Sequence, residues 1–184
     1  MIIGHVDSGK STLMGHILLK QGVISKNQLR KLEKESHDLG KGSFSFAWAL
    51  DEGEEERERG LTIDVAMKFF ETEKRHYTIL DAPGHQDFVP NMIMGAAQAD
   101  CAILVIASQP NEFDAGFTNG GETKEHAILA RSLGVTQIVV CVNKLDVIGW
   151  SKERYKEISN LVRPFLISVG FPPDRITFVP ISGF

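Results

Sequence analysis

The sequence predicts an α/β fold: a six-stranded, mostly parallel sheet with one antiparallel edge strand and helices on both faces. Short apolar runs alternate with longer amphipathic segments, a rhythm typical of parallel strands joined by crossover helices. Two of the apolar runs, Val65–Thr72 and His76–Asp81, are connected by Glu73–Arg75 alone, which fits an antiparallel hairpin. The chain has 184 residues, a length that corresponds to one domain.

The remaining elements are predicted from the same patterns in chain order. A short strand at Met1–Ile3 precedes a glycine-bracketed turn and a helix over Lys10–Gln21. A second helix is expected over Ser25–Leu39, with Ser25 as its N-cap. Further strands are predicted at Cys101–Ala107, Gln137–Val142 and Ile176–Val179, and further helices at Gln86–Gln98, Thr123–Leu133 and Lys152–Val169. Pro164 lies inside the last helix and is expected to kink or divide it.

The composition is that of an ordinary globular protein. Hydrophobic residues make up 42% and charged residues 24%, which excludes a disordered or collagen-like chain. The net charge of −4 gives no indication of nucleic-acid binding. The longest apolar run, Cys101–Ala107, is too short for a membrane span, so no membrane partner is expected. Cys101 and Cys141 each lie in an apolar run and are expected to be buried thiols in the reducing cytoplasm.

Residues 4–11, G-H-V-D-S-G-K-S, fit the phosphate-binding pattern G-x-x-x-x-G-K-S/T between a strand and a helix. The glycines let backbone N–H groups curl around phosphates at the N-terminus of the helix. Lys10 would reach the β- and γ-phosphates, and the Ser11 hydroxyl would ligate Mg²⁺. The fold class is therefore predicted to be that of a P-loop NTPase. Residues expected to contact a nucleotide here are His5, Val6, Asp7, Ser8, Gly9, Lys10, Ser11 and Thr12.

Two downstream positions fit the γ-phosphate side of such a site. Asp81 ends a predicted strand, where an aspartate can hold Mg²⁺ through water, and Gly84 can offer its N–H to the γ-phosphate. Thr62 comes after a charged run that is expected to lie mostly on a solvated face. Its hydroxyl could be ordered beside Mg²⁺ by the γ-phosphate and released afterwards. The expected metal ligands are thus Ser11, Thr62 and Asp81.

The sequence N-K-L-D at residues 143–146 comes directly after a predicted strand and indicates a guanine-binding motif. The Asp146 carboxylate would accept from the N1–H and 2-amino groups of guanine, whereas adenine would leave it unpaired. Asn143 would brace neighbouring loops, and the Lys144 stem would cover one face of the base. After the last strand, the Gly183 N–H could donate to guanine O6, with Ser182 and Phe184 beside it.

In this order the motifs resemble the G domain of translational GTPases. G-H-V-D-S-G-K-S-T, G-K-G-S-F-S-F-A-W, E-R-E-R-G-L-T-I-D and D-A-P-G-H resemble the elongation factor 1-alpha class over essentially the whole chain. Within that class, three stretches are most similar to the ribosome-rescue GTPase that partners Pelota: residues 95–100, 130–137, and 112–116 running into 120–123. The termination-factor GTPase is nearly as similar, and it shares sequence with this chain at residues 70–73 and 88–91.

The resemblance implies further roles. His85, the histidine after D-x-x-G, would orient the attacking water, and Val6 and Leu61 would form a hydrophobic gate that restrains it. Asp7 would take part in charge compensation at the phosphates, through a monovalent cation. Gln86 stands where relatives usually have Lys or Arg. The other histidines, His126 among them, have no role in the family and are expected to be structural or surface residues.

These observations together predict a GTP-hydrolysing switch that uses Mg²⁺ and hydrolyses GTP slowly until the ribosome stimulates it. The catalytic residues would be Lys10, Thr62, Gly84 and His85. Residues 1–184 would form one GTP-binding domain, trimmed at both ends and lacking the β-barrel domains that come after it in the family. Those domains hold a tRNA-shaped partner: a Pelota-like protein, a release factor or aminoacyl-tRNA. Two alternatives are a nucleotide-gated binding module without hydrolysis and a metabolic P-loop kinase.

Overall fold

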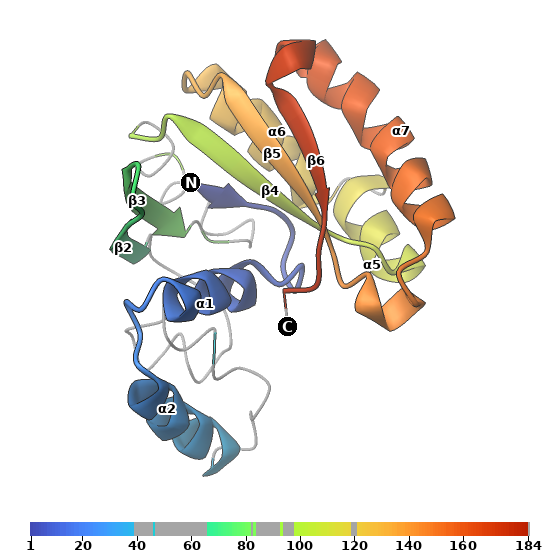
Figure 1. The fold of residues 1–184 in the computed structure, drawn as a ribbon. Helices are drawn as coiled ribbons and strands as arrows, with labels where there is room; N and C mark the ends of the chain where they lie inside the picture. The colour runs from blue at the N-terminus through green and yellow to red at the C-terminus, as the bar shows by residue number, and fades with distance from the viewer. Residues whose placement is uncertain are drawn as a thin grey trace.

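The computed structural model describes residues 1–38, 46, 66–81, 83, 93, 98–118 and 121–183. Within these ranges the chain forms a six-stranded sheet in the order β2-β3-β1-β4-β5-β6 (Figure 1). The strands are β1 (Ile2–Ile3), β2 (Ala66–Glu71), β3 (His76–Asp81), β4 (Cys101–Ala107), β5 (Gln137–Asn143) and β6 (Ile176–Pro180). β2 pairs antiparallel with β3 at one edge and every other pair is parallel, so the predicted fold class is confirmed.

The helices connect these strands largely where the sequence predicts them. They are α1 (Lys10–Lys20), α2 (Lys26–Asp38), α5 (Pro110–Phe113), α6 (Glu122–Ser132) and α7 (Lys152–Val169), with a π-helical segment at Asp114–Thr118 and 3-10 turns at Asp146–Ile148 and Pro173–Arg175. Ser25 caps α2 in a reciprocal pair: its hydroxyl accepts from the Gln28 N–H, and the Gln28 side chain accepts from the Ser25 N–H. The predicted helix at Gln86–Gln98 lies almost entirely outside the described residues.

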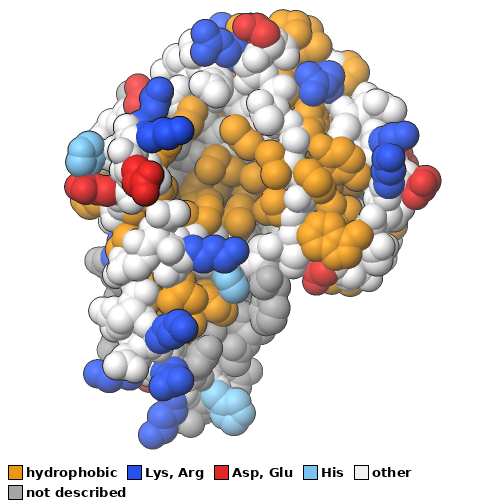
Figure 2. Space-filling model, viewed as in Figure 1, with side chains coloured by type: hydrophobic (Ala, Val, Ile, Leu, Met, Phe, Trp, Pro, Cys, Tyr) orange, Lys and Arg blue, Asp and Glu red, His pale blue; other side chains and the backbone are white. Residues whose placement is uncertain are grey.

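Helices lie on both faces of the sheet. One face carries the larger core, where α6 and α7 bury Ala127, Ile158 and Leu166 with inward residues of the strands. On the other face α1 buries Met14 and Leu18. Figure 2 looks onto this second face and shows apolar side chains across β4, β5 and β6 beside α1. The described helices therefore cover the two faces unequally.

The structure differs from two expectations. α7 is not divided at Pro164 but runs as one helix from Lys152 to Val169. Pro164 is exposed, and the buried Val162 and Leu166 on either side hold both halves of the helix on the same core. Cys101 is also exposed rather than buried, because it is the first residue of β4 and lies beyond the helix-covered part of the strand. Cys141 is buried as predicted, and burial raises the pKa of its thiol to about 11.

No helix in the described part of the chain is long and apolar enough to cross a membrane.

Candidate nucleotide-binding site

The loop between β1 and α1 is shaped by residues with unusual backbone angles. Gly4 and Gly9 have φ of 143° and 90°, and Asp7, which is exposed, has φ of 59°. A Cβ on Gly4 would overlap the Val105 carbonyl oxygen, and one on Gly9 would overlap the Asn143 amide nitrogen. Glycine is therefore required at both ends of the loop by close approach as well as by backbone conformation.

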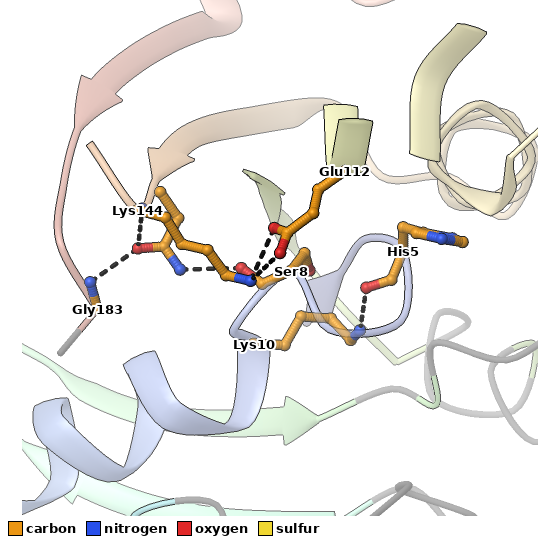
Figure 3. A network of polar contacts seen from close by, with 7 residues as sticks. His5, Ser8, Lys10, Glu112, Lys144 and Gly183 are labelled. Carbon is orange, nitrogen blue, oxygen red and sulfur yellow. Dashed lines mark hydrogen bonds and ion pairs between the residues drawn. The ribbon is translucent and has the colours of Figure 1, made fainter. Parts of the chain in front are cut away.

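Lys10 lies beneath this loop, at the start of α1, and is only 7% exposed. Its ammonium group donates to the His5 carbonyl oxygen at 2.8 Å, across the loop (Figure 3). Burial lowers the pKa of Lys10 to about 8, against the opposing charges of Asp81 and Asp7. A buried ammonium that donates to a carbonyl is incompletely compensated, so an anionic ligand at the loop would relieve a cost that the free protein carries.

Ser11, in the first turn of α1, meets Asp81, the last residue of β3, and the two side chains suit Mg²⁺. The Ser11 hydroxyl donates to a carboxylate oxygen of Asp81 at 3.0 Å, and Asp81 is fully buried. Adjacent ligands of an octahedral Mg²⁺ are about 2.9 Å apart, given metal–oxygen distances of about 2.0–2.1 Å. In the described part of the chain no group of three or more His, Cys, Asp or Glu could hold a metal ion. These two oxygens fit two adjacent positions around an octahedral Mg²⁺.

Asn143, at the end of β5, connects the loop to the last strand. It is 2% exposed, and its amide nitrogen donates to the Ser8 carbonyl at 2.9 Å. Its side-chain oxygen accepts from the N–H groups of Lys144 at 2.8 Å and Gly183 at 2.7 Å. The bracing expected of Asn143 is present. The Gly183 N–H, for which the sequence predicts a contact with guanine O6, donates to Asn143 in this structure.

A cavity of about 240 Å³ lies beside Asn143. It brings together the phosphate-binding pattern and the N-K-L-D motif, which are far apart in the sequence. Its lining residues are Gly9, Thr12, Asn143, Lys144, Asp146, Val147, Ser182 and Gly183. Asp146 is exposed, so its carboxylate is available to a ligand in this cavity.

Glu112 is a member of this site that no sequence motif indicates. Its carboxylate accepts from the Lys144 ammonium at 2.7 and 3.0 Å (Figure 3). Glu112 comes from α5, which begins at Pro110, a favourable residue for the first turn of a helix. The sequence contains no fixed spacing that could connect Glu112 with Lys144. The pair restrains the Lys144 side chain at the edge of the cavity.

Several predicted positions cannot be placed in this geometry. Leu61, Thr62, Gly84, His85, Gln86 and Phe184 lie outside the described residues. Of the other positions named for the loop, Val6 is half-buried and Ser8 is buried.

The strand order and the loop between β1 and α1 define the G-domain class of P-loop NTPases. Comparison with known families specifies the class further. The chain belongs to the family described as the Elongation factor Tu GTP binding domain, which matches residues 1–184.

Elongation factor 1-alpha of Tetrahymena pyriformis is 55% identical over 186 residues, which cover 100% of this chain and 43% of that protein. Elongation factor 1-alpha-B of Schizosaccharomyces pombe is 54% identical over 184 residues, covering 100% of this chain and 40% of that protein. The chain thus spans less than half the length of these relatives. Their names support the translational GTPase class that the sequence predicts. They do not distinguish the rescue branch within that class.

Two solved structures are similar over 99% of this chain. Sup35 complexed with GDP has a TM-score of 0.68 at 35% identity, with 36% of that chain covered. The S. cerevisiae Ski7 GTPase-like domain bound to GTP has a TM-score of 0.83 at 26% identity, with 42% of that chain covered.

Nucleotide binding should depend on pH through Lys10. Because the pKa of Lys10 is about 8 in the free protein, half of the ammonium groups have lost their proton at pH 8, and most have lost it above that pH. A bound phosphate would raise that pKa, so binding should take up a proton, and the affinity for GDP should fall by up to about tenfold per pH unit above pH 8.

Titration calorimetry at pH 8.5 in two buffers of different ionisation enthalpy measures this uptake. The Lys10→Arg variant, whose guanidinium does not titrate, should show none. Proton-neutral binding by the unsubstituted protein would contradict the prediction.

Proposed function

We propose that residues 1–184 are the GTP-binding and GTP-hydrolysing switch domain of a ribosome-associated translation factor of the cytoplasm. The observation that carries the proposal is the set of hydrogen bonds that Asn143 makes with Ser8 and Gly183. These bonds fix the phosphate loop next to the cavity that Asp146 lines. The phosphate loop and Asp146 then form the two ends of one site. A domain that holds a phosphate chain and a base in fixed relation is suited to a nucleoside di- or triphosphate. Membership of the family supports GTP as that nucleotide.

The reaction is GTP + H₂O → GDP + phosphate. Lys10 and the loop N–H groups would stabilise the negative charge that spreads over the γ-phosphate in the transition state. Ser11 and Asp81, with Thr62, would hold Mg²⁺, which supplies charge neutralisation at the β- and γ-phosphate oxygens. No arginine is among the described residues that line the site, which supports slow hydrolysis until the ribosome activates it.

The choice of base tests the proposed site most directly. Substituting Asp146→Asn replaces an acceptor by an amide that can donate to the 2-oxo group of xanthine. We expect GDP affinity to fall about 100-fold or more, and XDP to become the preferred ligand. Competition binding with GDP and XDP measures both. The Asp174→Asn variant removes a carboxylate far from the cavity and should keep the guanine preference. An unchanged preference in Asp146→Asn would refute the assignment of the base site.

We also propose that His85 orients the attacking water. Replacing His85→Ala should leave GDP affinity within about twofold, because the imidazole would contact water and not the nucleotide. Ribosome-stimulated hydrolysis should fall about 100-fold or more, the usual range for loss of a positioned proton-transfer group. Single-turnover phosphate release measures the rate, with equilibrium GDP binding as the control. Full stimulated activity in the variant would remove His85 from the mechanism, and no release from the unsubstituted protein would favour the binding module.

For the branch of the family, we propose the ribosome-rescue GTPase that partners a Pelota-like protein. The support is the sequence similarity at residues 112–116, 120–123 and 130–137. The identity of 54–55% to elongation factor 1-alpha favours a second candidate, delivery of aminoacyl-tRNA. These candidates share the nucleotide chemistry and differ in the partner that the GTP-bound factor carries.

The partner can be identified with the intact protein, purified from cell extract with a non-hydrolysable GTP analogue. A Pelota-like protein should copurify, and a parallel purification with GDP should release it. Copurification of a release factor would assign the protein to termination. Aminoacyl-tRNA would assign it to elongation and overturn the rescue proposal.

A further inference from the structure

His126 lies directly beneath the phosphate loop, although nothing in the sequence patterns assigns it a role. It is in the second turn of α6 and is fully buried. Its Nδ1 atom accepts from the N–H of Gly4 at 3.3 Å, so the contact joins residues 122 positions apart. Gly4 is itself buried and is the first residue of the loop. The imidazole thus satisfies a backbone N–H that is buried away from water.

The imidazole must be neutral to accept this hydrogen bond. When Nδ1 accepts, the ring proton is on Nε2, and protonation of Nδ1 would replace the acceptor by a second donor. Burial lowers the pKa of His126 to about 4, and the nearby positive charge of Lys10 contributes to this lowering. The ring is therefore uncharged at neutral pH, as the contact with Gly4 requires.

The position of Gly4 is restrained from two other directions. On one side, a Cβ would overlap the Val105 carbonyl oxygen, so the backbone packs against β4 without spare room. Next along the chain, His5 contacts the Glu122 carboxylate through its Nδ1 atom. Two consecutive loop residues are thus held by the first two turns of α6. This helix supplies a support for the loop that no residue of the phosphate-binding pattern provides.

We propose that His126 is a positioning residue that fixes the phosphate loop by accepting the Gly4 N–H, so that the other loop N–H groups face the phosphates. The inference rests on the proposed nucleotide site, but His126 itself touches no nucleotide. Its neutral Nδ1, and not merely the volume of the ring, is the feature that matters. Without that acceptor the Gly4 peptide would turn toward another partner, and the loop would lose its shape for phosphate.

Two substitutions separate the acceptor from the volume. His126→Leu keeps a side chain of similar size but has no acceptor, whereas His126→Asn places an amide oxygen near the position of Nδ1. We expect fluorescent GDP to dissociate about 10- to 100-fold faster from His126→Leu, as expected when a buried donor loses its partner. The His126→Asn variant should return the rate to within about threefold of the unsubstituted protein, because the acceptor is restored.

A matched control is available on the same helix. Leu129 packs against the same core but makes no polar contact with the loop. Leu129→Ala should lower the melting temperature and leave GDP dissociation unchanged, which shows that loss of stability alone does not loosen the nucleotide. Equal rates for His126→Leu and His126→Asn, both faster than the unsubstituted protein, would mean that packing matters and would overturn the proposal. So would an unchanged rate in His126→Leu.

The contact can also be tested without nucleotide. Nitrogen-15 NMR of the nucleotide-free protein should show the Nε2–H tautomer of His126 and a Gly4 amide protected from hydrogen exchange. The Nδ1–H tautomer, or a rapidly exchanging Gly4 amide, would overturn the inference. Failure of the unsubstituted protein to bind GDP would instead reject the proposed function, and the NMR result would still decide the role of His126.

Discussion

The site depends first on one buried amide, that of Asn143. It holds three backbone segments at once: the phosphate loop at Ser8, its own motif at Lys144, and the turn after β6 at Gly183. The contacts with the Ser8 carbonyl and the Gly183 N–H are buried, where a backbone group without a partner would be costly. β1, β5 and β6 end at the same side of the sheet, where the backbone hydrogen bond from the Ile181 N–H to the Val142 carbonyl at 2.9 Å also joins the last two strands. The Asn143 amide adds the phosphate loop to this connection, so it helps to set the distance between the phosphate and base ends of the cavity.

The loop itself is costly to form. Lys10 is buried without full compensation of its charge, Asp7 has a left-handed conformation that non-glycine residues rarely adopt, and Gly4 packs directly against β4. Contacts from α6 offset part of this cost, and a bound anion would offset more. A ligand that binds only the folded state stabilises it by mass action. The same features that make the loop costly when empty therefore favour phosphate binding, and they couple the stability of the domain to its ligand.

Residues outside the sequence motifs hold the phosphate loop and Lys144 in place. α6 holds Gly4 and His5 through its first two turns, and its last turn is tied to the end of α7 by the hydrogen bond from Arg131 to the Gly170 carbonyl at 2.8 Å. Glu112, on α5, restrains Lys144 in a comparable way. These helices join consecutive strands on the face that carries the larger core, so the packing that buries apolar side chains also positions the residues beneath the site. The precision of the loop is a property of the packed domain, since the loop sequence alone does not contain its own supports.

This division explains what could be predicted from the sequence. β3, β4 and α7 have the predicted bounds, because apolar periodicity and local backbone preferences determine such elements. The phosphate loop and Asn143 were found because their chemistry needs fixed residue types at fixed spacing. Glu112 and His126 were missed because each acts across a distance in sequence that no local pattern records. Pro164 shows that packing can also override a local preference. Proline tends to break a helix, but the buried neighbours on either side of Pro164 keep α7 continuous. Motifs thus identify which groups meet the nucleotide, whereas the residues that hold those groups in place become visible only when distant segments are seen packed together.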